Sequence, residues 1–283
     1  MPELPEVETV RRQLARAITG LVVASVDAVE VAMLRDCGED DLRSFLPGAR
    51  VEEVSRLGKF IIIRLGGLTE MYLTLHLGMT GQVLVCEMSG EESPAVSLHS
   101  HTRFLFRLEG PGGSITRVEF RDTRKFGRLH LTADGPAPRL RGLGPDAWLG
   151  DWDAAYLTQR LYGRRVPIKA FLLDQRHLAG IGNIYSDEIL WWTGISPLRP
   201  AGSLSFSEVA RLTGEIRRCL EEGIQRAGCT LSDFVDTEGR PGGFQEHLQA
   251  YRRQGLVCSR CGETLLRTVI AGRGTAHCPG CQR

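Results

Sequence analysis

The sequence predicts an α+β protein with a β-rich first half, a helical second half and a zinc-binding β-hairpin near its C-terminus. Short runs of β-forming residues, separated by turn residues, fill positions 21–133. Segments with helical periodicity follow a Pro- and Gly-rich stretch at 133–146. Two CxxC pairs lie within residues 258–281. These patterns indicate more than one domain, which a length of 283 residues allows.

The opening stretch, MPELPEVETV, predicts a helix over residues 5–14. Pro5 suits a first helical position, and the carboxylate of Glu6 favours the positive end of the helix dipole. The apolar residues that follow repeat at helical spacing. Glu6 could also orient a neighbouring site, and the sequence leaves both roles open. Pro2 and Glu3 precede this helix and contribute nothing to it, so they need another explanation.

The β-rich runs are short and regularly spaced, which is typical of a sandwich or barrel rather than of βαβ units. The stretch ADGPAPRLRGLGPD reads as a linker. A long loop, CTLSDFVDTEGRPGGF, follows the last predicted helix, and such loops in compact domains are usually functional or mobile. The predicted helices cover residues 153–163, 166–178, 183–194 and 205–227.

The composition is that of an ordinary globular protein, with 42% hydrophobic and 24% charged residues. No apolar run approaches the roughly 20 residues of a membrane span. The acidic N-terminus is not followed by the apolar region of a secretory signal, so we expect a cytosolic protein. A net charge of +1 gives no overall electrostatic case for nucleic acid. Any nucleic-acid site must therefore be a local patch.

The two CxxC pairs predict one structural Zn²⁺ per chain. Four thiolates on two tight turns complete a tetrahedral site and leave no position open for catalysis. The residues between them, GETLLRTVIAGRGTAH, read as a β-hairpin whose turn presents Arg273. That arginine is either a solvated turn residue or a finger that reaches a phosphate. The predicted ligands are Cys258, Cys261, Cys278 and Cys281, and we expect Cys37, Cys86, Cys219 and Cys229 to be buried apolar thiols.

Lysine is rare in this chain, because only Lys59, Lys125 and Lys169 occur among 35 basic residues. An ammonium can give up a proton whereas a guanidinium cannot, so each lysine merits separate attention. Lys59 sits on a Gly turn before the apolar run FIII. In FRDTRKFGRL, basic residues surround Phe126, which suits either a nucleic-acid groove or a solvated hairpin.

Two further turns carry candidate contacts. In HLAGIGNIYSDEI, Gly180 and Gly182 allow close backbone approach, and Asn183 stands where a helix begins. Such a helix start is a ready phosphate seat, although a simple N-cap explains Asn183 as well. Met79, in HLGMTG, is either a core residue or a wedge.

These motifs occur in one order along the whole chain and resemble bacterial formamidopyrimidine-DNA glycosylases. The motifs that carry the resemblance are MPELPEVETVRR, RLGKF, HLGMTG, DTRKFGRL, LLDQRHLAGIGNIYSDE, PGGFQ and the terminal cysteine pairs around AGRGT. The resemblance implies an N-terminal catalytic β-sandwich with a leading helix at 1–134 and a linker at 135–150. It also implies a helix–two-turn–helix domain with a base-capping loop at 151–245 and a zinc finger at 246–283.

The resemblance also implies a function in base excision repair. Such an enzyme acts as a monomer on damaged double-stranded DNA in the bacterial cytoplasm, at the nucleoid. It removes 8-oxoguanine and formamidopyrimidines and then cleaves the strand by β,δ-elimination. The chemistry answers the question raised by Pro2 and Glu3. Removal of Met1 would leave Pro2 as a secondary amine that forms a Schiff base with the deoxyribose, with Glu3 as its proton-transfer partner.

Further residues take roles from the resemblance. Lys59 matches the proton donor of the β-elimination, and Arg273 matches the arginine assigned to the δ-elimination. Asn183 and Arg164 match phosphate contacts. The residues that match those filling the void left by a flipped nucleotide are Met79, Arg124 and Phe126. Either His99 or His101 matches a DNA-contacting histidine.

Two positions depart from the family pattern, and two rival functions remain. Cys229 and Gly243 stand in the capping loop, CTLSDFVDTEGRPGGF, where the family most often has Thr and Tyr. An endonuclease VIII-type enzyme for oxidised pyrimidines is disfavoured by Leu4, where that branch usually has Gly, and by HLGMTG. A zinc-finger DNA-binding protein without catalysis would not explain Pro2, Glu3 or Lys59.

Overall fold

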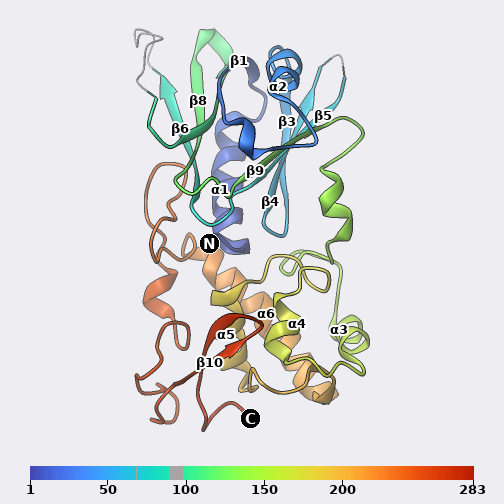
Figure 1. The fold of residues 1–283 in the computed structure, drawn as a ribbon, viewed down its shortest axis with the longest axis vertical. Coiled ribbons are helices and arrows are strands. Elements are labelled where there is room, and N and C mark those ends of the chain that lie inside the picture. The colour runs from blue at the N-terminus through green and yellow to red at the C-terminus, as the bar shows by residue number, and fades with distance from the viewer. Residues whose placement is uncertain (68, 89–97) are drawn as a thin grey trace. The chain divides into compact units, whose positions relative to one another are not determined.

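The computed structural model describes residues 1–67, 69–88 and 98–283, and the chain forms two units (Figure 1). The first unit joins residues 1–141 to residues 227–242, and the second joins 142–226 to 243–283. The segment 227–242 therefore folds with the N-terminal part of the chain, although helical residues flank it in sequence. The predicted domain boundaries at 134, 150 and 245 stay predictions.

Helix α1 (Leu4–Ile18) is longer than predicted. It starts after Glu3, which is extended with φ −108° and ψ −170°. It runs on to Ile18 because its apolar stripe does so: Val10, Leu14 and Ile18 are fully buried. A second helix, α2 (Glu39–Phe45), was not predicted.

The first unit contains a nine-stranded sheet of order β2-β9-β5-β4-β3-β1-β7-β8-β6. Strands β1 and β3 pair only at Val22 and Arg50, so the sheet divides there into two halves. Buried side chains of both halves, such as Phe106 and Ile63, belong to one core together with the stripe of α1. The predicted α+β fold with an N-terminal sandwich is therefore confirmed. The strands are β1 (Val22–Val29), β2 (Leu34–Arg35), β3 (Arg50–Leu57), β4 (Phe60–Gly66), β5 (Met71–His76), β6 (Gly81–Met88), β7 (Thr102–Glu109), β8 (Ile115–Asp122) and β9 (Arg128–Thr132).

The second unit is helical, as predicted, and ends in a hairpin. Helix α4 is shorter than expected, because Asp174 adopts an extended backbone with ψ 106°. Helix α6 begins with a capping box in which Ser205 and Glu208 bind each other's backbone N–H groups. The helices are α3 (Ala154–Leu161), α4 (Ile168–Leu173), α5 (Asn183–Thr193) and α6 (Phe206–Gln225). The hairpin pairs β10 (Leu266–Ile270) with β11 (Arg273–His277). No helix in the described part of the chain is long and apolar enough to cross a membrane.

Candidate functional site

The carboxylate of Glu6 holds the N-terminal segment. The sequence left two roles open for Glu6, one at the helix start and one in orienting a neighbouring site. Pro2 is buried, and Glu3 is only 2% exposed. Glu6 Oε2 accepts the backbone N–H of Glu3 at 2.7 Å, and Glu6 Oε1 accepts the backbone N–H of Cys229 at 2.8 Å. One side chain thus fixes the residue after Pro2 and also anchors the loop 227–242.

The turn that carries Lys59 is tied to α1 by a buried ion pair. Arg56 Nε lies 3.0 Å from Glu8 Oε2, and Arg56 Nη1 donates to the carbonyl of Gly58 at 2.8 Å. Burial raises the pKa of Glu8, but hydrogen bonds from Arg11 and Arg56 outweigh it and leave that pKa below its usual range. Lys59 itself is 7% exposed. Its position is therefore set relative to the helix that follows Pro2 and Glu3.

His76 is a neutral neighbour of Lys59 that the sequence did not single out. Burial, followed by the charge of Lys59, lowers the pKa of His76 to about 4. Its Nδ1 accepts the backbone N–H of Gly78 at 3.1 Å, which requires an unprotonated nitrogen there. His76 can therefore offer an Nε2–H donor at neutral pH without adding charge next to Lys59.

Asp122 gathers the two turns that present the predicted wedge residues. Its fully buried carboxylate accepts the hydroxyl of Thr80, and also the backbone N–H groups of Arg124 at 3.1 Å and Gly127 at 2.7 Å. The turns also touch at Gly78, where an added Cβ would lie 2.6 Å from the carbonyl carbon of Phe126.

The predicted wedge residues are exposed on these adjoining turns. Met79 is 40% exposed and Phe126 is 43% exposed. The guanidinium of Arg124 lies 4.6 Å from the centre of the Phe126 ring. An exposed aromatic ring with a cation over it can enter a gap in a base stack.

The two candidate histidines lie side by side before β7. Their ring centres are 5.4 Å apart, and the carbonyl of His101 accepts the backbone N–H of Asp122 at 3.0 Å. His99 is exposed and His101 is half-buried. The DNA contact at His99 or His101 stays a prediction.

In the second unit, Asn183 is not an N-cap. Gly182 occupies that position, and Asn183 Nδ2 donates to the carbonyl of Gly274 on the hairpin at 3.1 Å. A surface hollow of about 210 Å³ opens beside this bond, and two of its lining residues are Arg252 and Arg267. The helix start, the hairpin and two guanidinium groups thus meet at one site that suits a phosphate.

Lys169 fastens the same hairpin to the helices. Its ammonium is fully buried and lies 2.6 Å from Asp187 Oδ1 and 2.8 Å from Thr275 Oγ1. The other oxygen of Asp187 accepts the backbone N–H of Ala276 at 3.1 Å. Lys169 therefore joins α4, α5 and β11 through its ion pair with Asp187 and the hydrogen bonds around that pair.

Arg273 was expected within the hairpin turn, but it is the first residue after that turn. Ile270 pairs with Arg273, so Ala271 and Gly272 form the two-residue turn, with φ 48° and 71°. Arg273 is the exposed first residue of β11. Arg164 is exposed after α3 and makes no hydrogen bond to Asn183 or Arg273 among the described residues.

The four cysteines of the CxxC pairs form one cluster, as predicted. Their sulfur atoms all lie within 4.8 Å of one another. The Sγ–Sγ distances are 3.9 Å for Cys258–Cys281 and 3.4 Å for Cys261–Cys278. Tetrahedral ligation with Zn–S bonds of about 2.3 Å places sulfur atoms about 3.8 Å apart, so the cluster fits zinc. Among the remaining cysteines Cys219 and Cys229 are buried, as expected. Cys37 is half-buried and Cys86 is exposed, which corrects the expectation that both are buried.

Three family models match consecutive parts of the chain. Residues 1–129 match the formamidopyrimidine-DNA glycosylase N-terminal domain, and residues 143–235 match the H2TH domain of the same enzymes. Residues 255–283 match the zinc finger found in FPG and IleRS.

Full-length relatives and solved structures agree with these matches. The formamidopyrimidine-DNA glycosylase of Moorella thermoacetica is 44% identical over 270 residues, 94% of either chain. That of Chloroflexus aurantiacus is 39% identical over 283 residues, covering 100% of this chain and 98% of the relative.

A Lactococcus lactis FPG mutant in complex with Fapy-dG-containing DNA matches with a TM-score of 0.88 and 31% identity over 100% of both chains. MutM in complex with DNA containing carbocyclic 8-oxo-G matches with a TM-score of 0.87 and 32% identity, again over 100% of both chains. By full-length identity and by fold, the chain belongs to the formamidopyrimidine-DNA glycosylase family.

Proposed function

We propose that this chain is a bifunctional DNA glycosylase of base excision repair. It excises 8-oxoguanine and formamidopyrimidines from double-stranded DNA and then cleaves the strand at the abasic site by β,δ-elimination. The relatives carry the name of this activity, and the solved neighbours hold DNA with Fapy-dG or 8-oxo-G. The observation in this chain that carries the proposal is the buried Pro2–Glu3 segment held by Glu6.

Pro2 is the proposed nucleophile. Once Met1 is removed, its ring nitrogen is an α-amine, and such amines titrate roughly 2 to 3 units below lysine. The nitrogen attacks the deoxyribose C1′, the glycosidic bond breaks, and the base leaves with a proton. The C1′–O4′ bond then breaks, O4′ takes a proton as the sugar ring opens, and the product is an iminium between Pro2 and C1′. Glu3 is fixed beside the amine by the peptide bond and serves as the proton-transfer group.

The other predicted residues bind DNA or assist elimination in this proposal. Lys59 supplies a proton during β-elimination, and Arg273 assists δ-elimination while gripping a phosphate. Asn183 and Arg164 contact the backbone. Met79, Arg124 and Phe126 occupy the space vacated by the extruded nucleotide, and His99 or His101 touches the strand. The single Zn²⁺ holds the hairpin that carries Arg273 and takes no part in the chemistry.

The predicted organisation completes the proposal. We assign catalysis to the domain at 1–134 and DNA binding to the domains at 151–245 and 246–283, joined by the linker at 135–150. The enzyme works as a monomer at chromosomal DNA in the bacterial cytoplasm, because its substrate lies there.

Borohydride trapping tests the proposed nucleophile. Reduction of the iminium should link the enzyme covalently to a duplex carrying 8-oxoguanine, and peptide mapping should place the adduct on Pro2. Pro2→Gly should lower trapping without abolishing it, because glycine still supplies an α-amine. An extra residue before Pro2 should abolish trapping, since the nitrogen becomes an amide. An adduct on Lys59 with Pro2 unmodified would refute this proposal.

A panel of single-lesion duplexes tests the substrate class. We expect 8-oxoguanine and formamidopyrimidine lesions to be excised faster than oxidised pyrimidines. The comparison is needed because a solved Lactococcus lactis neighbour, 32% identical, holds DNA with an oxidised pyrimidine. Faster excision of pyrimidines would favour the endonuclease VIII-type alternative. Tight duplex binding without excision of any lesion would favour a non-catalytic binding protein.

A further inference from the structure

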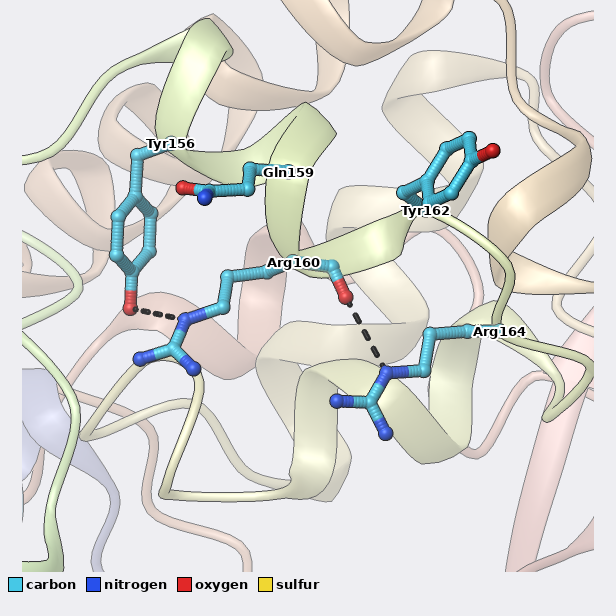
Figure 2. A pocket seen from close by; sticks show the side chains of 5 residues that line it. All are labelled: Tyr156, Gln159, Arg160, Tyr162 and Arg164. Carbon is cyan, nitrogen blue, oxygen red and sulfur yellow. Dashed lines mark hydrogen bonds between the residues drawn. The ribbon is translucent and has the colours of Figure 1, made fainter.

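The C-terminal end of α3 and the turn after it form a hollow of about 370 Å³, which Figure 2 shows from close by. Two arginines and two tyrosines account for most of its lining. Tyr162 is 87% exposed, which is unusual for an aromatic ring on a monomer surface. The lining residues are Tyr156, Gln159, Arg160, Tyr162 and Arg164.

Arg160 is held in place through Tyr156. The Tyr156 hydroxyl accepts Arg160 Nε at 3.3 Å and donates to the carbonyl of His177 at 3.0 Å. The guanidinium also lies 5.3 Å from the centre of the Tyr156 ring. These contacts use the Nε of Arg160, and neither of its NH₂ groups makes a hydrogen bond to a described residue. The fork of donors that binds phosphate therefore stays available.

Arg164 adds a second cation to the same hollow. Its Nε donates to the carbonyl of Arg160 at 3.4 Å. Figure 2 shows both guanidinium groups on the same side of the turn. Among the described residues, no carboxylate lies within ion-pair distance of Arg160 or Arg164, whereas Arg176 nearby is paired with Asp174 at 2.6 Å.

The local charge is accordingly positive. Burial lowers the pKa of His177, and the charges of Arg164 and Arg160 lower it further against the opposing charge of Asp174. Two neighbouring cations without a carboxylate repel each other, and an anion between them would relieve that repulsion. In Figure 2 the exposed ring of Tyr162 points away from both guanidinium groups, so the two arginines are the groups that would hold the anion. The proposed function makes a DNA strand, rather than a free phosphate, the expected source of that anion.

We propose that this hollow seats a backbone phosphate of the DNA duplex that flanks the lesion, with Arg160 and Arg164 as its paired cations. Tyr156 is a positioning residue that fixes Arg160. This assignment rests on the proposed function and extends it, because it adds Arg160 and Tyr156 to a DNA contact at Arg164. The hollow provides affinity and not sequence specificity.

The salt dependence of DNA binding tests the hollow. The full-length zinc protein is titrated with a duplex carrying a non-cleavable abasic-site analogue at several salt concentrations. Arg160→Gln should reduce the slope of log K against log salt by about 1. The affinity ratio of wild type to variant should then shrink about 3.5-fold between about 50 and 200 mM salt. Tyr156→Phe should shift the slope in the same direction by less.

Arg176→Gln is the matched control, because Arg176 is exposed nearby but paired, and its slope should equal that of wild type. A photo-crosslinking amino acid at position 159, which lines the hollow on the same side as Arg160, should link to the duplex outside the lesion nucleotide. Equal slopes for Arg160→Gln and Arg176→Gln would overturn the proposal. So would saturable binding of inorganic phosphate with no change in the DNA slope. Base excision by the wild type, measured separately, reports on the proposed function alone.

Discussion

The carboxylate of Glu6 accepts the backbone N–H of Cys229 at 2.8 Å, across 223 positions of sequence. The approach is close, because a Cβ added at the preceding Gly228 would lie 2.9 Å from Glu6 Oε1. The same carboxylate holds Glu3. In this family member the loop is therefore coupled to the N-terminal segment through one side chain, and disturbing either end should be felt at the other.

Glu6→Gln should loosen the loop. A glutamine offers one oxygen, so its NH₂ group would face either the Glu3 or the Cys229 N–H and leave it unbound. An unsatisfied buried amide costs about 1–3 kcal/mol. We expect hydrogen exchange at Cys229 to speed up roughly 5- to 150-fold, with slower excision and unchanged zinc content. Glu39→Gln at the half-buried start of α2, outside the Glu6 network, is the control. Unchanged exchange at Cys229 would contradict the coupling.

Removing zinc should melt the hairpin and abolish DNA binding. The cluster has four thiolate ligands, and metal binding of this kind supplies folding free energy. Elemental analysis should give one zinc per chain, and Cys261→Ser should lose both metal and DNA affinity. Cys86→Ser changes an exposed thiol outside the cluster and should lose neither. Full DNA affinity in Cys261→Ser would count against a zinc-dependent hairpin.

Replacing Lys59 and replacing Arg273 should affect different steps of the reaction. Lys59→Ala should slow processing of 8-oxoguanine, and it should slow β-elimination at preformed abasic sites while leaving some cleavage there, because the proton donor of that step is lost. Arg273→Ala should weaken DNA binding and the last strand cleavage, because a phosphate grip is lost. Gel analysis of both substrates distinguishes the steps, with Arg43→Ala on α2 as the control. Wild-type excision by Lys59→Ala would reduce Lys59 to a structural turn residue.

Breaking the Lys169–Asp187 pair should destabilise the second unit. Lys169→Met leaves the buried Asp187 carboxylate without its ammonium, and such losses cost about 3–5 kcal/mol. Adding Asp187→Leu removes the stranded charge and should restore part of the stability. Denaturant unfolding of the two single variants and the double variant measures the coupling. Additive effects would show that the two groups do not depend on each other.

The stability around Glu188 should fall as pH rises. Burial raises the pKa of Glu188 to about 7, although the backbone N–H groups of Gln249, Tyr251 and Ala250 oppose it. A carboxyl whose pKa is raised in the folded state makes its full contribution to the stability of the fold when the pH is below its ordinary pKa of 4.5. This contribution is lost as the pH rises through about 7. The loss amounts to at most about 3 kcal/mol.

Hydrogen-exchange protection at Ala250 and Tyr251 reports this change. Relative to Glu188→Gln, which cannot titrate, the wild type should lose protection between about pH 5 and 7. The pH dependence of the stability contributed by His76 has the opposite sign. Its pKa is lowered in the folded state, so its contribution to stability is lost as the pH falls from 6.5 to about 4. A constant ratio of wild type to Glu188→Gln across this range would contradict the assignment.

The sequence predicted the features whose signals are local. Helical periodicity located α1 and the four helices of the second unit, and the CxxC spacing located the cluster. The exposure of Cys86 could have been predicted too, because β6 alternates and Cys86 falls on the same face as Gln82 and Leu84. Helix α2 was missed because it is short and has few apolar residues.

The site was harder to predict, because its geometry depends on pairs far apart in sequence. Residues 8 and 56, 80 and 122, and 169 and 187 meet only in the folded chain. Asp122 did carry a local signal, since Asp before a Gly-containing turn often binds backbone N–H groups. Nothing in the sequence showed that it also binds Thr80. The place of Arg273 depended on whether the hairpin turn has two or three residues, which AGRGT leaves open.

The segment 227–242 makes the first unit discontinuous, and this limits how the gene can be divided. A fragment that ends at Arg141 would lack the residues that bind Glu6, Gln13 and Val85. In the second unit, by contrast, the N–H of Gly243 already donates to the carbonyl of Arg226 at 2.8 Å. A short bridge there would splice out the insertion and close the helical unit. Residues 227–242, which the first unit would then lack, could be supplied as a separate peptide. We expect this peptide and a fragment of residues 1–141 to assemble into the complete first unit.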